Sequence, residues 1–596
     1  MNRINVCILI FILFSSLLLF SQDIPVQYLS PLPESKYNNK ETNIIISSNR
    51  TADKNIIGNK GNITVEGSIS GLHKGEVLIA SDGRTIIFKP FKPFSLSETV
   101  HVKLSSRITG KPGSFEYKFY VKDKEIAPTR SDYFLKELGM KYFNNSLFPV
   151  SNIYSDSLPA NFPSPTVMVS NNPSPSKIFL TCFSFFPSYG TYLMIFNNDG
   201  TPYFYRNAAF PTDFKKILNG NLVYFDGDKA KYYELDTNYF IVDSFYTGNG
   251  YTTDQHELKY LANGNAYLMS YDPVFVNMSQ IIQGGDTNAL VTGLIIQEID
   301  ANKNVIFQWR SWDHIPITDC SNQDLLNDTI DYVHGNAIEP DTDGNIMISS
   351  RHLDEITKIN RTTGAIMWRL GGGKSNQFTF INDTDKFNFQ HDIRRLKNGH
   401  ITLFDNGNAH TPPYSRAVEY DINEQAKTAT LVWQFRSNPD IFGPFMGNVQ
   451  RLDNGNTMIG WGGTIAEPVT TFTEVSPNGT KLLEMKLPNF VFSYRAYKFD
   501  WDFPEIKIPA TYALKQNYPN PFNPETKIEF DIPEPTYVQL KIYNILGAEV
   551  ATLVNQFLQP RIYIIKWNAG SYASGVYFYQ IISNKLTETK KMVLIR

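Results

Sequence analysis

A ten-residue pattern with an Asn-Gly turn at its centre recurs along the middle of the chain. Its clearest copies read apolar-x-x-Leu-x-Asn-Gly-Asn-x-apolar. Two apolar runs joined by Asn-Gly form a tight β-hairpin, because Asn and Gly accept the positive φ that such a turn needs. The five clear copies lie at residues 214–226, 258–270, 338–350, 393–405 and 449–461. A chain built on this unit is expected to form a succession of antiparallel sheets.

A second kind of hairpin follows most copies of the first. It starts with an acidic residue, passes through a turn and ends in apolar and aromatic residues; its copies lie at 297–310, 357–370, 418–435 and 473–487. A weaker unit near Lys177 brings the number of units to six. Four-stranded repeats of about 40 to 50 residues indicate a propeller. The sequence therefore predicts an all-β fold with a six-bladed β-propeller domain at residues 177–505.

The spacing of the turns locates two insertions in the predicted propeller. Asn263 and Asp343 are 80 residues apart, whereas the other neighbouring turns are separated by 44, 55 and 56 residues. The extra residues fall at 271–293 and 311–331. Insertions in repeat proteins gather on the face that carries function, so we expect these two to shape a pocket.

The flanking segments predict three further regions. Short strand-like runs favour an N-terminal immunoglobulin-like β-sandwich at residues 24–121, and alternating residues at 514–596 favour a second small β-sandwich. The proline-containing stretch 122–176 is interpreted as a linker that can hold one short helix at Asp132–Phe143. Residues 1–22, a positive charge followed by an apolar run, are typical of a secretory signal peptide.

Composition narrows the class of protein. Hydrophobic residues make up 42% and aromatic residues 14% of the chain, which favours strands over helices. The formal net charge of −3 argues against nucleic acid as a partner. Beyond the signal peptide, no segment is apolar and long enough to predict a membrane span. Cys182 and Cys320 remain after signal removal; a disulfide and two buried thiols are both compatible with the sequence.

Three histidines share one position in the repeat. About seven residues before the turn, the five clear units carry Thr212, His256, His334 (two residues further out), His391 and Gly447. Equivalent positions in a propeller converge on its axis, so His256, His334 and His391 are expected to share a pocket. The remaining histidines are interpreted as ordinary structural or surface residues, although His314 lies in an insertion that can reach the pocket; they are His73, His101, His314, His352, His400 and His410.

Arg351 is the other candidate, because it follows a strand in the same unit as His334. Three histidines and an arginine suit transfer of an anionic group through a histidine nucleophile, with the guanidinium binding the oxyanion. They also suit a metal site with three histidine ligands and an open position. The arginine favours the anion, and we predict no metal or other cofactor. The run Gly371–Lys374 does not fit the spacing of a phosphate-binding loop.

Three stretches resemble the bacterial arylsulfotransferase family: HELKYLANGN, HGNAIEPDTDGNIMISSRHLDEITKINRTTGAIMWRLGG and QHDIRRLKNGHITLFDNGN. The resemblance covers roughly residues 177–490. It implies transfer of a sulfuryl group from a phenolic sulfate ester to a phenol acceptor by a ping-pong mechanism, with no nucleotide sulfate donor. By motif, His391 would become the sulfohistidine and His256 would be a general acid and base. His334, Asn336 and Arg351 would hold the sulfuryl oxygens.

The end of the chain carries a second resemblance. NYPNPFNPETKIEF, IYNILG and ASGVYFYQI resemble the C-terminal sorting domain of the type IX secretion system. This implies export through the periplasm and outer membrane by that machinery, to the cell surface or the medium. The N-terminal β-domain fits the arylsulfotransferase family as well, where it is linked to homodimer formation.

Two other functions fit the same predicted fold. One is a non-catalytic cell-surface propeller that binds a ligand, for which the three aligned histidines are not needed. The other is a hydrolase, either an aryl sulfatase with water as acceptor or a metal-dependent enzyme. Turnover of an aryl sulfate with and without phenol, and with and without a chelator, separates these alternatives.

Overall fold

The computed structural model describes residues 25–57, 61–126, 158–184, 188–503, 509, 511–534, 536–558 and 561–595. The predicted signal peptide and the helix predicted at Asp132–Phe143 lie outside these residues. Within them the chain is mainly β-strand. Its helical pieces are α1 (Ser106–Thr109), α3 (Ser311–His314) and the 3-10 turns η1 (Lys54–Ile56), η2 (Met278–Gln280), η3 (Ile317–Asp319) and η4 (Arg351–Leu353). No helix in this described part is long and apolar enough to cross a membrane.

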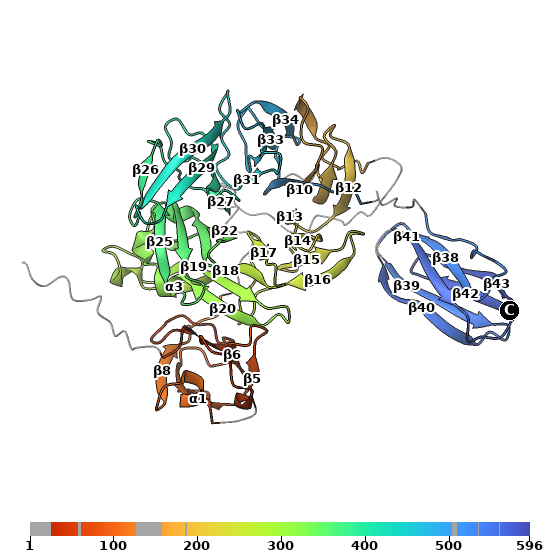
Figure 1. The fold of residues 1–596 in the computed structure, drawn as a ribbon, viewed down its shortest axis with the longest axis horizontal. Helices are drawn as coiled ribbons and strands as arrows, with labels where there is room; N and C mark the ends of the chain where they lie inside the picture. Colours follow the sequence, from red (N-terminus) through yellow and green to blue (C-terminus); the bar gives the residue numbers. More distant parts are fainter. Residues whose placement is uncertain are drawn as a thin grey trace, which may run out of the picture.

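In the described part of the chain, six mainly antiparallel sheets follow one another around a common centre (Figure 1). We number them ring sheets 1 to 6 in chain order. Neighbouring ring sheets contact each other through their innermost strands, for example β22 with β27 and β27 with β31. This arrangement is propeller-like, and it brings the first strand of each predicted unit to the centre.

The strands of the ring are as follows, from the innermost outward. Ring sheet 1 has β36 (Ala496–Phe499) and β35 (Val491–Phe492), both paired with β10 (Lys177–Ser184), then β11 (Tyr192–Phe196) and β12 (Pro202–Asn207). Ring sheet 2 has β13 (Thr212–Lys216), β14 (Leu222–Asp226), β15 (Lys231–Leu235) and β16 (Ile241–Phe245). Ring sheet 3 has β17 (Leu258–Tyr260), β18 (Ala266–Val276), β19 (Ala289–Ile299) and β20 (Val305–Arg310). Ring sheet 4 has β22 (Gly335–Pro340), β23 (Ile346–Ser350), β24 (Glu355–Ile359) and β25 (Ile366–Gly371). Ring sheet 5 has β27 (His391–Arg395), β28 (Ile401–Asp405), β29 (Arg416–Asn423), β30 (Thr428–Arg436) and β26 (Thr379–Ile381). Ring sheet 6 has β31 (Asn448–Arg451), β32 (Thr457–Gly460), β33 (Phe472–Val475), β34 (Lys481–Lys486) and β9 (Thr166–Ser170).

The recurring Asn-Gly-Asn sequence has a physical explanation in the turns. In all five copies the first side-chain oxygen accepts a hydrogen bond from the N–H two residues on, and the glycine has a positive φ. In four of the copies the third residue reaches across to an acidic side chain on the third strand of the same sheet. These pairs are Asn221–Glu234, Asn265–Glu298, His400–Glu419 and Asn456–Glu474. The acidic start of the second hairpin is therefore the partner of the first hairpin's turn.

The ring is closed at two places by strands from distant parts of the sequence. Ring sheet 1 takes β36 from beyond the last unit, and this strand pairs antiparallel with β10. Ring sheet 6 takes β9 as an outer strand beside β34. The interpretation of 122–176 as linker is therefore wrong for Thr166–Ser170. The stretch is short and alternates, and it forms a strand because it covers the exposed edge of β34.

The two predicted insertions both extend ring sheet 3. Residues 271–293 lengthen the β18–β19 hairpin, whose eleven residue pairs run from Ala266–Ile299 to Val276–Ala289. Residues 311–331 contain α3 and η3 and end in β21 (Thr329–Asp331), which pairs parallel with β19. This parallel pairing delivers Asp331 to the centre of the ring.

The N-terminal region consists of two four-stranded antiparallel sheets that share one core. One sheet has β1 (Tyr28–Ser30), β2 (Ile44–Ser47), β6 (Thr85–Pro90) and β5 (Gly75–Ile79). The other has β4 (Gly71–His73), β3 (Ile63–Gly67), β7 (Thr99–Leu104) and β8 (Phe115–Tyr120). The Tyr28 hydroxyl bonds both backbone groups of Gln308, which attaches this sandwich to ring sheet 3. The immunoglobulin-like topology stays a prediction.

The C-terminal region is a second two-sheet unit with its own core, drawn in blue in Figure 1. Its sheets are β37 (Ala513–Leu514), β38 (Glu525–Ile532) and β41 (Arg561–Asn568), and β40 (Glu549–Leu558), β39 (Thr536–Asn544), β42 (Gly575–Ile582) and β43 (Thr587–Leu594). It contacts the ring of sheets through Tyr563, whose aromatic centroid lies 6.0 Å from that of Phe240.

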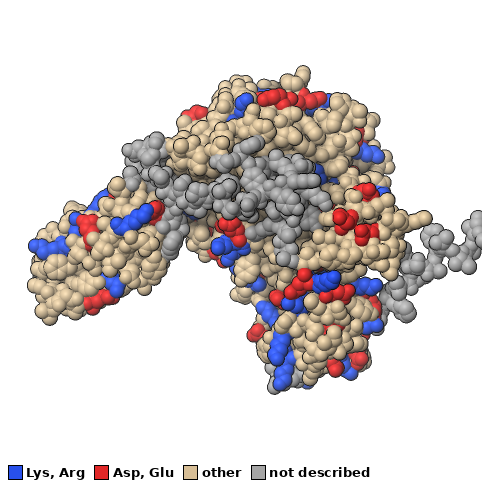
Figure 2. Space-filling model, turned by 180° about the vertical axis from the view of Figure 1, so that it is seen from behind, with Lys and Arg blue, Asp and Glu red and all other residues tan. Residues whose placement is uncertain are grey.

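Two remaining features concern charge and sulfur. Lys and Arg are interspersed with Asp and Glu on the face shown in Figure 2. Cys182 and Cys320 are free and buried, so the thiol alternative holds. Burial raises the pKa of the Cys182 thiol to about 12 and that of Cys320 to about 11, which keeps both protonated at neutral pH.

Candidate active site

The innermost strands of ring sheets 3, 4 and 5 each begin at or just after one of the predicted histidines. His256 precedes β17, His334 precedes β22 and His391 is the first residue of β27. The pairing of β22 and of β27 with the next strand shifts register within its first residues. Positive φ values at His334 and Asp392 accompany these irregularities. Such bulges re-aim side chains, and here they occur where the histidines turn toward the centre.

The structure brings these histidines into one cluster. The rings of His256 and His334 lie 5.3 Å apart between centroids, and His334 lies 4.7 Å from His352. Burial lowers the pKa of His391 well below its ordinary value, and the charges of Arg351, His334 and His256 lower it further. His391 is therefore a neutral imidazole surrounded by groups that carry or can carry positive charge.

Each of the three rings is held through the same nitrogen, Nδ1. The Nδ1 of His256 lies 2.5 Å from Oδ1 of Asp254, and the Nδ1 of His334 lies 2.7 Å from Oδ2 of Asp331. The Nδ1 of His391 lies 2.8 Å from Oδ1 of an amide, Asn406. Because all three partners are acceptors, each Nδ1 carries a proton and each Nε2 is left for other chemistry.

The amide orientation of Asn406 is fixed by its own contacts. Its Nδ2 donates to the backbone oxygens of Gly443, at 2.6 Å, and Met446, at 2.9 Å. Its Oδ1 must then face His391, which makes Nδ1 of that ring the donor. A carboxylate stabilises an imidazolium, whereas an amide does not, so His256 and His334 differ electrostatically from His391.

Although burial alone would raise the pKa of Asp254, the His256 charge and hydrogen bonds hold it below its ordinary value.

Tyr271, on the extended β18, closes one side of the pair formed by Asp254 and His256. Its hydroxyl donates to the Gly335 carbonyl at 2.7 Å and lies 3.4 Å from Nδ1 of His256.

Arg351 begins η4 and is buried beside the cluster. Its Nη1 lies 2.9 Å from Nε2 of His352, and its Nη2 donates to the Pro444 carbonyl at 3.1 Å. The guanidinium carbon lies 4.9 Å from the centre of the Phe389 ring. These contacts hold a permanent positive charge next to His391.

Asn336 links two innermost strands. Its Nδ2 donates to the Gln390 carbonyl at 2.8 Å, and its Oδ1 accepts from the Asp392 N–H at 3.3 Å. Both amide atoms thus contact the backbone on either side of His391. The prediction that Asn336 holds sulfuryl oxygens stays a prediction; the bonds present here fix the position of His391.

A buried ionic layer follows the histidines along the innermost strands. It contains the acidic residues Asp213, Glu257 and Asp392 and the basic residues Lys215, Arg394 and Arg495. Arg495 contacts all three carboxylates, at 2.9, 3.2 and 3.2 Å. Although burial alone would raise the pKa of Glu257, the cations Arg394, Arg495 and Lys215 hold it far below its ordinary value. Equal numbers of opposite charges let this layer fill the centre of the ring.

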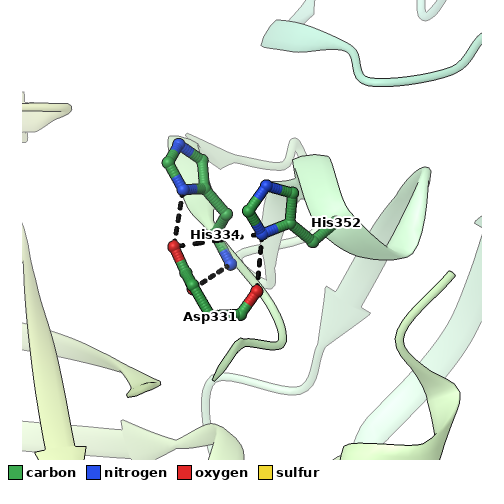
Figure 3. A group of neighbouring side chains, drawn as sticks. All are labelled: Asp331, His334 and His352. Atoms are coloured by element: carbon green, nitrogen blue, oxygen red, sulfur yellow. Dashed lines mark hydrogen bonds and ion pairs between the residues drawn. The ribbon is translucent and has the colours of Figure 1, made fainter. Parts of the chain in front are cut away.

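Asp331, His334 and His352 form the group drawn in Figure 3 and offer the donor types of a metal site, with ligand atoms within 4.8 Å of one another. The surroundings do not fit a cation. Nδ1 of His352 donates to the Asp331 backbone carbonyl at 2.5 Å, and its Nε2 accepts from Arg351. A metal ion here would displace one of these bonds and face the guanidinium, so the cluster suits an anion.

The out-of-register histidines fall into two classes. His352 lies in the cluster, so its interpretation as an ordinary residue is wrong. His314 stacks on Trp309 at 5.1 Å, and His400 and His410 pair with Glu419 and Asp405. The last two have structural partners, as expected.

Sequence reasoning missed Asp254, Asp331 and Asn406. Asp254 lies two residues before His256, a spacing from which a carboxylate can reach the imidazole. Asn406 follows the apolar run of β28, a signal available in the motif LFDNGN. Asp331 is brought in by the parallel pairing of β21, which local sequence does not indicate.

Two family models match the chain. A family model described as arylsulfotransferase (ASST) matches residues 140–498, more than half of the chain. A second model, described as a secretion system C-terminal sorting domain, matches residues 516–595. Such a domain directs a protein to the cell surface or the medium through type IX secretion.

A curated relative is the arylsulfate sulfotransferase AssT of Escherichia coli O6:H1 strain CFT073. It is 29% identical over 170 residues, and the match spans 22% of this chain and 28% of that relative.

Solved structures give only distant likenesses. A Bacteroides caccae protein of unknown function has a TM-score of 0.36 at 12% identity, over 55% of this chain and 99% of its own. PorZ, a surface component of the type IX secretion system of Porphyromonas gingivalis, has a TM-score of 0.26 at 14% identity, over 93% of this chain and 68% of its own. Likenesses this distant carry no argument about function.

Proposed function

The chain belongs to the arylsulfotransferase family, and from this premise we propose that it is an exported aryl-sulfate sulfotransferase. It would move a sulfuryl group from a phenolic sulfate ester to a phenol acceptor. The reaction would proceed by a ping-pong mechanism, without a nucleotide sulfate donor. The type IX sorting domain makes the protein a secreted or cell-surface one.

One observation carries the proposal: the three clustered histidines have different partners on Nδ1. His256 and His334 face carboxylates, whereas His391 faces the amide of Asn406. A nucleophile must be neutral, and a general acid must carry a proton to give away. The amide partner and the low pKa suit His391 to attack, and the carboxylate partners suit the other two to carry charge.

In the first half-reaction, Nε2 of His391 attacks the sulfur of the donor. The new N–S bond forms as the bond between sulfur and the phenolic oxygen breaks, and His256 gives its proton to the departing phenolate. In the second half-reaction the acceptor oxygen attacks the same sulfur and the N–S bond breaks. His256 takes the proton of the acceptor phenol, which restores both residues to their starting forms.

Positive charge around the sulfuryl group lowers both barriers. Arg351 and His334 would bind the sulfuryl oxygens and stabilise their negative charge in a site from which water is excluded. Asn336 would fix the backbone of β27 so that His391 keeps its line of attack. We further propose that the six ring sheets are the blades of a six-bladed propeller. The N-terminal sandwich would be immunoglobulin-like and would support a homodimer.

The test is phenol release from a chromogenic aryl sulfate by the purified mature chain. We expect turnover that rises with an added phenol, ignores a chelator and vanishes in His391→Ala. Turnover that does not depend on phenol would indicate a sulfatase, and loss with chelator a metal enzyme. No turnover across several donors and acceptors would favour a ligand-binding propeller and contradict the proposal.

A further inference from the structure

His352 lies between His334 and Arg351 and contacts both residues. It lies on η4 directly after Arg351, it is 2% exposed, and its ring packs against His334 at 4.7 Å and 43°. Figure 3 shows both imidazoles next to Asp331. The mechanism described above does not use His352, although its ring contacts two residues that the mechanism does use.

The contacts of this ring leave one protonation state. Its Nδ1 lies 2.5 Å from the backbone oxygen of Asp331, which only accepts hydrogen bonds. Its Nε2 lies 2.9 Å from Nη1 of Arg351, which only donates. The Gln323 amide nitrogen, 3.4 Å from the same Nε2, is a second donor. The ring is therefore neutral, with its proton on Nδ1 and a lone pair directed at the guanidinium.

Asp331 thus treats its two histidines differently. Its carboxylate accepts a hydrogen bond from Nδ1 of His334 at 2.7 Å. Its backbone carbonyl accepts from Nδ1 of His352 at 2.5 Å and sets the tautomer, and the carboxylate lies farther from that nitrogen, at 3.9 Å. One residue at the end of β21 therefore contacts both imidazoles, His334 mainly through its carboxylate and His352 mainly through its backbone carbonyl.

We propose that His352 is a positioning residue that holds the Arg351 guanidinium in place for a sulfuryl or similar oxyanion by accepting its hydrogen bond at Nε2. The proposal rests on the proposed function, in which Arg351 binds the sulfuryl group. Two bonds, to His352 and to the Pro444 carbonyl, fix two guanidinium nitrogens, Nη1 and Nη2. A guanidinium fixed in this way loses less freedom on binding an anion.

Acidic pH is expected to disrupt the contact between His352 and Arg351. Protonation of His352 turns its acceptor into a donor and places a second positive charge against Arg351. Charged or titratable groups near the ring include Arg351, the Asp331 carboxylate at 3.9 Å from Nδ1, His334, and Asp354, whose pKa is raised, mainly by burial. Acid should therefore release Arg351 and weaken the binding of the donor.

The experiment compares His352→Gln with His352→Asn in the full mature chain. The end of a Gln side chain corresponds to Nε2 and can still accept from Arg351. The end of an Asn side chain corresponds to Nδ1 and cannot. Kinetics with p-nitrophenyl sulfate, the inhibition constant of inorganic sulfate and thermal unfolding are measured for both variants and the wild type from pH 5 to 9.

We expect the Asn variant to lose about 10- to 100-fold in kcat/KM for the donor, as removal of a hydrogen bond to a charged group would cause. Its KM and its sulfate inhibition constant should rise together. The Gln variant should stay near the wild type. Its acid limb should also move to lower pH, because Gln does not titrate and the pKa of His391 is already low. A merely structural role would lower the active fraction and leave KM unchanged.

Binding of inorganic sulfate by calorimetry keeps the two proposals separate. If the wild type turns over no aryl sulfate, but the Asn variant binds sulfate more weakly than the Gln variant, the proposed function fails and the role of His352 stands. Equal sulfate affinities and one shared acid limb in all three proteins would overturn the role of His352, whether or not the wild type is active.

Discussion

At the scale of single residues, the partner of each imidazole decides what that imidazole can do. Three histidines in equivalent repeat positions would have equal roles if the repeat alone mattered. The structure gives two of them carboxylates and the third an amide. The Asp and Asn partners differ by one atom, an oxygen in place of a nitrogen. This difference separates the imidazoles that are suited to carry a proton from the one that is suited to attack.

The first prediction concerns Asn406. Replacement by Ala removes the closer acceptor of the proton on Nδ1 of His391 and leaves only the Phe389 carbonyl at 3.3 Å, so the ring can rotate and present the wrong nitrogen. By analogy with the partners of metal-bound histidines, we expect a loss of about 10–100-fold in kcat. KM for the donor should change little. Steady-state kinetics check this, and an unchanged kcat would show that the amide does not position the ring.

The second prediction concerns His256 as general acid. His256→Gln should cost about 10²–10⁴-fold in turnover of donors whose phenol is strongly basic, because those leaving groups need a proton. Donors with acidic nitrophenols should lose much less. A series of aryl sulfates of rising phenol pKa measures the slope. His400→Gln, whose histidine caps a turn through Glu419, is the matched control and should behave as the wild type. A parallel loss across the series would refute the role.

The sequence predicted those residues of the candidate site that occur at a regular place in the repeat. His256, His334 and His391 were found because their spacing from the Asn-Gly turn is regular, and Arg351 because it follows a strand of one unit. His352 was missed because η4 turns the chain after Arg351, so its position has no counterpart in other units. Asp331 was missed because a non-local parallel strand pairing brings it in.

At the scale of elements, the innermost strands β13 and β27 combine an irregular start with a charged second residue, Asp213 and Asp392. The bulge turns a side chain to the pocket, and the next residues enter the ionic layer. The layer is costly to desolvate, and it is tolerated because each carboxylate meets several cations. We infer that it fixes the positions of the strands and hence of the histidines above them.

The third prediction tests this layer. Arg495→Met leaves Asp213, Glu257 and Asp392 short of one cation, and breaking a buried pair costs about 3–5 kcal/mol. The low pKa of Glu257 stabilises the fold above the unfolded value of about 4.3 and ceases to do so as pH falls. With Arg495 gone, that pKa rises, so the variant should also unfold at higher pH than the wild type.

Urea unfolding at neutral and acidic pH measures both effects. The control is Arg436→Met, which breaks the exposed pair with Asp440 and should cost at most about 1 kcal/mol. Equal losses in the two variants would mean that the central layer does not stabilise the ring.

The hairpins themselves were predictable, because Asn-Gly turns and alternating residues are local signals. Strand β9 was not, because Thr166–Ser170 becomes a strand only when the edge of β34 is there to pair with it. The same holds for β21. Elements whose pairing is set by distant parts of the chain leave little trace in their own sequence.

At the scale of the whole molecule, the site lies within the ring and the C-terminal sandwich has a separate core. The fourth prediction is that a chain ending at residue 503 keeps the kcat and KM of the full chain. All residues assigned a role in the site or in the ionic layer lie between Asp213 and Arg495, and the sorting domain contacts the ring of sheets at Phe240, just before the outer strand β16 of ring sheet 2. Parallel kinetics of the two purified chains check this. A large fall in kcat with an intact thermal transition would show that the sorting domain takes part in the site.

The fifth prediction addresses the central claim, a sulfuryl group carried by His391. The full mature chain is mixed with excess aryl sulfate and no acceptor, and phenol release is followed while the protein is mapped by mass spectrometry under mildly alkaline conditions. We expect a burst of one phenol per active chain and one added sulfuryl group on the peptide that contains His391, which disappears when phenol is added. Release without a burst, or a sulfuryl group on another residue, would contradict the account.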